Sequence, residues 1–354
     1  MEHISTLLMQ LIRHLHSVKH SGVQLQSENN SIDKKLCMKA INIKLKLSIL
    51  FFFCIVIIRQ SIAQEEQMSS QYLFNMMNIN PAYAGNRGVA NLTSLFRNQW
   101  SGVEGAPRYG NISFDMPFQA QNSAIGLQFI SDKIGVQKNQ GVKFNYAYRI
   151  QFADEQILSL GLNVGIKNRR ANYTEVSTFI SGDPLLNSNI SSLNADAGFG
   201  VFYSSQKFFI GASSPMLLVS NVNSNDPLET NAKWLQAVKA NDLNMFLTTG
   251  YLLNLSQQIK LMPSVMLRRG SSSMNADLNA KLWINDILSI GASYRTQESI
   301  LGMIEWQMSP FLRFGYSYDR STSKTKLYNI ASNELMLRIS FSNNSNLTGV
   351  SKYF

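Results

Sequence analysis

The chain has 354 residues and a formal net charge of +10. All four histidines and both cysteines lie before Gln64, so the sequence from Gln64 onward contains neither residue type. That part of the chain therefore cannot build a cysteine nucleophile, a Ser-His-Asp triad, a zinc site of His or Cys, a haem ligand set or a disulfide. Its 24 basic and 19 acidic residues leave a modest net charge of +5.

The first predicted element is a secretory signal peptide. Three lysines precede the apolar run 47–58, and the small residues Ser61 and Ala63 follow it. This is the three-part layout of a signal that is removed on export. The run has 12 residues, whereas a membrane anchor needs about 18 or more, which makes an anchor the weaker alternative. We interpret residues 1–63 as an upstream extension plus a signal peptide that starts at Met38 and is cleaved before Gln64.

Residues 64–88 show no two-residue alternation. Pro81 and Gly85 are turn residues within this stretch. We expect a short periplasmic segment that folds back into the interior of the following domain as a plug.

Alternation with a two-residue period is clearest in two neighbouring segments, 142–152 and 158–166. Each places apolar side chains on one face and polar side chains on the other, as a β-strand does. Only the short polar stretch 153–156 separates them. The two segments therefore predict an antiparallel hairpin with one apolar face.

The same pattern continues to the end of the chain and predicts about 14 strands. The connections between them are alternately short and long, so that long loops gather at one end. The predicted strands begin near residues 89, 109, 123, 141, 157, 194, 207, 242, 258, 275, 287, 299, 310 and 333. The predicted long loops include 101–108, 131–140, 171–193, 215–241 and 320–332.

Alternation alone leaves a soluble β-rich domain open as an alternative. The gathering of long loops at one end favours an outer-membrane barrel, which has short periplasmic turns and long outer loops. No window of the exported chain is long and apolar enough for a transmembrane helix. The predicted fold class is all-β, a transmembrane antiparallel β-barrel over residues 89–342 with a C-terminal tail at 343–354. Its expected place is the cell outer membrane, in contact with lipid.

Two motifs near the start of the exported chain are required by neither barrel geometry nor composition. The first motif is Asn80, Pro81, Ala82, Tyr83, Ala84 and Gly85, and the second is Arg97, Gln99, Trp100, Gly105, Ala106 and Pro107. With these motifs, the chain resembles the PorP/SprF family of type IX secretion system outer-membrane proteins from about Gln71 to its end. The aromatic ending Tyr353-Phe354 is also similar to that family.

The resemblance implies a protein that is not an enzyme and that helps to export or anchor cell-surface proteins such as gliding adhesins. It also implies contact with other type IX components on the periplasmic side and with secreted surface proteins. We expect no cofactor, no metal and no nucleic-acid partner. An outer-membrane transporter or porin for small or hydrophobic solutes is the alternative, and an outer-membrane hydrolase is a remote third.

Several charged residues fall on the polar phase of their strands and are candidates for the barrel lumen. They would line a selective pore, or they would pair with one another in a lumen filled by the plug, which is the reading we favour. Trp100 and Trp306 are expected in the aromatic girdles of the membrane interfaces, whereas Trp283 lies on the polar phase. The candidate lumen residues are Lys143, Arg149, Lys167, Arg268, Lys281, Arg295, Glu305, Arg313 and Arg338.

Overall fold

The computed structural model describes residues 69–153, 156–175, 188–224, 236–238, 243–270, 274–296, 298–322, 331–341 and 353. The predicted signal peptide and its cleavage before Gln64 lie outside these residues, as does the tail apart from Tyr353.

Two short 3-10 helices come before the strands, and β-structure accounts for most of the described residues. Among those residues, no helix is long and apolar enough to cross a bilayer. The helical turns ahead of the strands are η1 (Met76–Asn78) and η2 (Pro81–Tyr83), and two more lie in connections, η3 (Gln119–Gln121) and η4 (Tyr173–Glu175). The strands are β1 (Ala90–Asn98), β2 (Arg108–Phe118), β3 (Ser123–Ile134), β4 (Gln137–Ala153), β5 (Gln156–Ala171), β6 (Ile190–Ser204), β7 (Phe208–Ser224), β8 (Gln236–Ala237), β9 (Met245–Tyr251), β10 (Leu253–Asn254), β11 (Ile259–Arg269), β12 (Met274–Ile284), β13 (Leu288–Arg295), β14 (Ser299–Ser309), β15 (Leu312–Ser321) and β16 (Ala331–Phe341).

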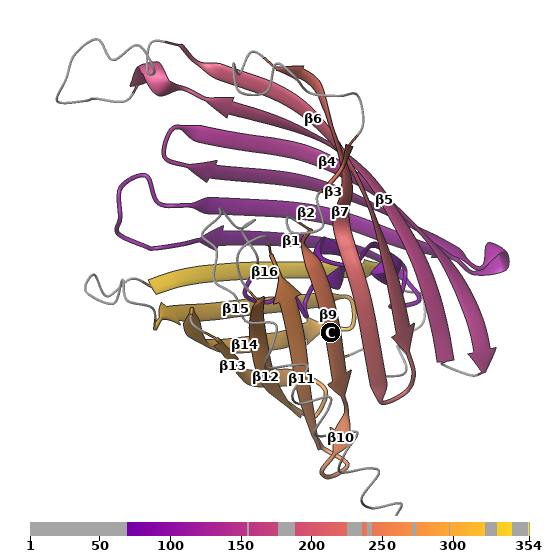
Figure 1. Ribbon diagram of the computed structural model, residues 1–354. Coiled ribbons are helices and arrows are strands. Elements are labelled where there is room, and N and C mark those ends of the chain that lie inside the picture. Colours follow the sequence, from indigo (N-terminus) through magenta and orange to yellow (C-terminus); the bar gives the residue numbers. More distant parts are fainter. Residues whose placement is uncertain are drawn as a thin grey trace, which may run out of the picture. The chain divides into compact units, whose positions relative to one another are not determined.

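These strands close into an antiparallel barrel (Figure 1). Each wall strand pairs with its neighbours in chain order, β9 bridges β7 and β11, and β1 pairs with β16 to complete the circle. Two further strands have only two residues each and are not counted as wall strands. Strand β10 continues the line of β9 along β11, and β8 pairs with the end of β7. The wall thus has fourteen strands, and the predicted fold class is confirmed. Closure leaves no free sheet edge in the wall.

The side chains of the wall are arranged inside out relative to a soluble protein. Outward positions such as Phe144 and Leu162 are apolar and 44 % and 59 % exposed, whereas the intervening Asn145 and Asn163 are buried. Such a surface is stable only against an apolar medium, as in a membrane barrel. The predicted hairpin of β4 and β5 is confirmed, with Tyr146 opposite Leu162.

Long connections gather at one end of the barrel, called here the loop end, and short ones at the other, called the turn end. The prediction of a long loop at 131–140 is wrong, because β3 runs to Ile134 and β4 starts at Gln137. Likewise, β7 continues through the first third of the predicted loop 215–241 as far as Ser224. In β3 and β4 the residues near this turn are mostly polar on both faces. In β7 a register shift opposite residues 197–199 breaks the alternation around Pro215, so the two-residue signal of a strand disappears there.

Candidate functional site

The interior of the barrel is occupied by the chain itself. Residues 69–89, called here the plug, run from the loop end of the lumen to the turn end, where they enter β1. At the loop end, Ser69 Oγ donates to Glu334 of β16 at 2.6 Å. At the turn end, the Gly85 amide donates to Asp115 of β2 at 3.0 Å. Between these points the plug side chains are almost wholly buried, including Tyr72 at 1 % exposure.

The first family motif forms the part of the plug that packs most tightly on the wall. Asn80 caps η2 by accepting from the Ala82 amide at 3.0 Å, and its Nδ2 donates to the Val201 carbonyl of β6 at 3.0 Å. Pro81 occupies the first helical position, where a missing amide proton costs nothing. Opposite this turn the wall has no side chain, since a Cβ at Gly161 would collide with the backbone of Ala82. The motif and the wall glycine are therefore complementary in shape.

The remaining motif residues Tyr83, Ala84 and Gly85 complete the plug. The Tyr83 ring meets Phe202 of β6 edge to face, with centroids 5.5 Å apart. Gly85 has a φ of +68°, a conformation that suits glycine, and a Cβ there would also collide with Ala124 of β3. The chain needs this glycine to turn from the plug toward β1.

Arg97 of the second motif fastens the other end of the plug. Its Nη2 donates to Asp319 of β15 at 2.9 Å and its Nη1 lies 3.3 Å from Glu334. The same Nη1 contacts Ser70 Oγ of the plug. This buried network joins β1, β15, β16 and the plug, and a charge within it has several partners, which buried charges require.

The rest of the second motif does not join the plug. Gln99, Trp100, Gly105, Ala106 and Pro107 form the β1–β2 connection at the loop end. The Gln99 amide donates to the Pro107 carbonyl at 2.9 Å, and the Gly105 carbonyl accepts from the Gly135 amide of the next turn at 2.8 Å. Trp100 is 41 % exposed with a φ of +53°. This half of the motif shapes a surface loop.

Five candidate lumen residues lie in the turn-end half or middle of the barrel, and all but the partly exposed Arg149 are buried. Lys281 Nζ contacts Glu305, and Arg313 Nη1 lies 3.7 Å from the same carboxylate. The Arg338 guanidinium is stacked on the Phe74 ring of the plug at 4.2 Å. Arg149 lies at the turn end of β4, and the charge of Asp115 acts on it.

In the loop-end half of the lumen, Arg268 and Arg295 pair with carboxylates. Arg295 Nη2 lies 3.0 Å from Asp277 Oδ2 and its Nε lies 3.4 Å from Glu298. Arg268 lies beside the same Glu298 at 2.5 Å. Asp277 and Glu298 thus balance the charges of these two arginines.

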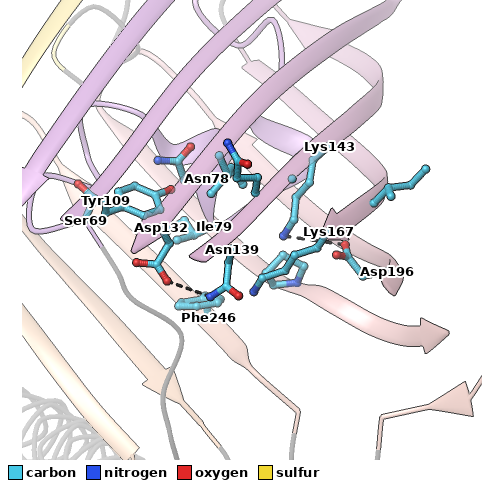
Figure 2. Close-up of a pocket in the computed structure, with 15 residues that line it drawn as sticks. Ser69, Asn78, Ile79, Tyr109, Asp132, Asn139, Lys143, Lys167, Asp196 and Phe246 are labelled. Atoms are coloured by element: carbon cyan, nitrogen blue, oxygen red, sulfur yellow. Dashed lines mark hydrogen bonds and ion pairs between the residues drawn. The ribbon is translucent and has the colours of Figure 1, made fainter. Parts of the chain in front are cut away.

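The remaining two candidates, Lys143 and Lys167, line a small cavity above the plug (Figure 2). Its volume is about 90 Å³, and Ile79 of the plug contributes to its lining. Lys143 Nζ lies 3.9 Å from Asp196, and Asn139 donates to Asp132 at 3.2 Å. The plug lies between this cavity and the turn end.

Tyr353 near the chain end is a lumen residue that sequence reasoning did not place. Its ring meets Trp283 at 5.6 Å, and its hydroxyl donates to Asp286 at 3.0 Å and accepts from Lys260 at 2.5 Å. Trp283 is fully buried and lies under the Arg313 guanidinium at 4.8 Å, whereas Trp306 faces outward and is 47 % exposed. In the sequence, Trp283 stands among the polar positions of its alternating strand, and this position correctly indicates that it points inward.

A family model described as type IX secretion system membrane protein PorP/SprF matches residues 61–339. The chain belongs to the PorP/SprF family. A search of curated proteins finds no match. PorP/SprF membership and the barrel fold place the protein in the outer membrane as a type IX secretion component.

Solved structures with a similar fold are outer-membrane barrels of low identity. The P. putida toluene transporter TodX is 8 % identical, with a TM-score of 0.44 over 76 % of this chain and 95 % of that one. Omp33 of Acinetobacter baumannii is 10 % identical, with a TM-score of 0.41 over 72 % and 98 %. A Pseudomonas aeruginosa FadL homologue is 10 % identical, with a TM-score of 0.41 over 75 % and 93 %.

Proposed function

We propose that this PorP/SprF protein is a non-enzymatic scaffold of the type IX secretion system that helps to export or anchor cell-surface proteins such as gliding adhesins. The observation that carries the proposal beyond family membership is the plug. A lumen crossed by the protein's own chain and bonded to the wall from Glu334 to Asp115 is suited to a closed scaffold rather than to a solute channel.

In a closed barrel, the surfaces left for protein partners are the two ends. We propose that secreted cargo meets the loop end, above all the connections 172–189 and 225–244, which are the longest. The type IX machinery would then meet the periplasmic turns, such as 205–207 and 285–287. Residues 69–86 do not offer this surface, because almost all of them are buried inside the barrel.

Deletion of the gene tests this proposal. Loss of surface display of particular secreted proteins, with small-solute uptake unchanged, is the expected result. Complementation with a chain that lacks residues 225–235 should restore the barrel but not display. Removal of 323–330, a connection at the same end, is the matched control and should restore both. Normal display combined with lost uptake of a nutrient would replace the scaffold with the transporter alternative.

Export itself has a separate test. We propose that signal peptidase cleaves before Gln64, so N-terminal sequencing of protein purified from outer membranes should begin at or near that residue. A purified protein that retains the apolar run 47–58 would contradict this.

A further inference from the structure

The outward face of β2, β3, β4 and β5 carries side chains in three registered rows near the loop end. Within each row, every residue is the cross-strand partner of the next. The row nearest the middle of the barrel is apolar and consists of Ile112, Phe129, Val142 and Ile166. The next row is small or polar and consists of Gly110, Ser131, Gln140 and Asn168. The last row, called here the basic row, consists of Arg108, Lys133, Lys138 and Arg170.

The basic row places four positive charges directly opposite one another on adjacent strands. All four side chains are exposed, and among the described residues none of them has an ion-pair or hydrogen-bond partner. Like charges that face each other across strands destabilise a sheet. This arrangement becomes favourable only when an anionic partner covers the row.

Outward basic residues on two other strands, β11 and β15, have no basic cross-strand neighbour. Arg269 has Met245 and Met274 as its cross-strand partners. Arg320 has Ile300 and Ala331. The concentration of charge on β2 to β5 is therefore a local feature of that side and not a general property of the loop end.

A groove lies next to the basic row on the same face. Its volume is about 770 Å³, and its lining includes the apolar and polar rows together with Phe96 of β1. Gly110 contributes no side chain to it, and a Cβ placed there would have only the Ser131 carbonyl within 4 Å, at 3.9 Å. Phe96, Ile112 and Phe129 are each about half exposed, at 50 %, 51 % and 51 %.

The order of the rows matches the layers of a membrane leaflet. The apolar row ends the belt that faces acyl chains, and the basic row stands four residues further on, about 13 Å along the strand. In outer-membrane barrels the end with long loops faces the cell exterior. The basic row thus lies at the headgroup level of the outer leaflet, where long basic side chains reach phosphates while their stems stay on apolar surface.

We propose that this face binds a multiply acylated lipid with a phosphorylated headgroup from the outer leaflet. An acyl chain lies in the groove beside Gly110, and the headgroup phosphates lie on the basic row. This site uses only the barrel wall and goes beyond the secretion role, so either proposal can fail without the other.

Native mass spectrometry of the full exported protein in detergent tests the site, with bis-phosphorylated lipid A as the probe. The wild type should retain the lipid, and the same lipid stripped of both phosphates should bind much more weakly. The variant Lys133→Gln/Lys138→Gln removes two basic residues. Each contributes about 1 kcal/mol of attraction to an anionic surface, so the variant should bind the lipid roughly 30-fold more weakly. Arg269→Gln/Arg320→Gln is the control of equal charge and should bind as the wild type does.

Two further measurements distinguish binding of the whole lipid from binding of a phosphate group alone. Gly110→Leu fills the groove and should weaken binding although the basic row is intact. Inorganic phosphate at millimolar concentration should not displace the lipid. If the Lys133→Gln/Lys138→Gln protein fails to fold, Arg108→Gln/Arg170→Gln serves in its place. Equal binding of phosphorylated and stripped lipid, or equal loss in the control variant, would overturn the proposal.

Discussion

Arg313 and Arg338 lie directly opposite each other on β15 and β16, with both guanidinium groups buried in the lumen. Arg338 Nε and Nη1 have no hydrogen-bond partner among the described residues. The charge of Arg87 in the plug adds to the repulsion. The turn-end half of the lumen therefore holds more positive charge than its carboxylates balance.

Removing Arg338 should not harm the barrel. Arg338→Met keeps an apolar contact for Phe74 and removes a repelled charge, so we expect unchanged or higher stability, by up to about 4 kcal/mol. Glu305→Gln is the contrasting variant, because it leaves Lys281 and Arg313 without their carboxylate and should cost about 3 to 5 kcal/mol. Urea unfolding in detergent measures both. Similar losses in the two variants would show that Arg338 has a partner of its own.

A side chain at Gly161 should displace the plug. Gly161→Val places methyl groups against the backbone of Pro81 and Ala82, and such overpacking costs about 1 to 3 kcal/mol. We expect the wild type to be closed in planar bilayers and the variant to show discrete conductance. Gly302→Val is the matched control, since a Cβ there meets nothing within 4 Å. Conductance that is the same in both variants would mean that the plug does not close the barrel.

A charge on the lipid-facing wall should be costly, and the cost should depend on depth. Leu162→Arg lies midway along the apolar part of β5 and should destabilise the barrel by about 2 to 4 kcal/mol. Gln140→Arg, also outward but beyond the apolar belt, should cost less than about 1 kcal/mol. Refolding into vesicles under a denaturant gradient compares them, and equal costs would contradict the assigned membrane span.

Inward positions are not a suitable neutral control for that experiment. From alternation alone, arginine at Asn145 or Asn163 is expected to be tolerated. In the structure both positions are almost fully buried, at 2 % and 3 % exposure, and Asn163 Nδ2 donates to the Pro215 carbonyl at 3.1 Å. Arginine has no room at either position.

Docking of Tyr353 should depend on pH. Burial raises the pKa of the Tyr353 hydroxyl above its ordinary value. The neutral phenol therefore stabilises docking fully below about pH 10, and this contribution is lost as the pH rises through the raised pKa. Tyr353→Phe lacks the bonds to Lys260 and Asp286 at every pH. The fluorescence of Trp283, with the other tryptophans replaced by phenylalanine, should separate the two proteins at pH 8 and converge above pH 10. A constant difference across this range would contradict the prediction.

The wall of the barrel follows from the sequence because one face of each strand meets lipid and the other meets polar groups. Strand starts at 123 and 299 were predicted to the residue. The start of β4 was not predicted, since polar residues on both faces remove the two-residue signal. For this reason the sequence predicts a ten-residue loop at 131–140, whereas the structure has a two-residue turn at Gly135 and Val136. The second half of β7 was not predicted because a register shift around Pro215 breaks the alternation.

The interior follows from the sequence only in part. The polar phase of a strand shows that Arg97 and Arg313 point inward, but it cannot show that one meets paired carboxylates and the other a second arginine. The carboxylates of Glu334 and Asp319 lie 237 and 222 residues from Arg97 in the chain. Arg338 meets Arg313 through the register in which β15 pairs with β16. Cross-barrel register, not local pattern, decides which charges meet.

The plug also sets the order of events when this protein is made. The segment that fills the lumen comes immediately before β1, and β1 is the strand that closes the barrel by pairing with β16, the last to be synthesised. Residues 69–89 have to occupy the lumen before β1 pairs with β16, because otherwise they would have to be threaded through a closed barrel. The Ser69 hydroxyl and the Ser70 amide both donate to Glu334 on β16, one of the two strands that form the seam. Filling the barrel and closing it are therefore coupled steps of insertion, and a chain that lost its plug would lose part of the template for its own closure.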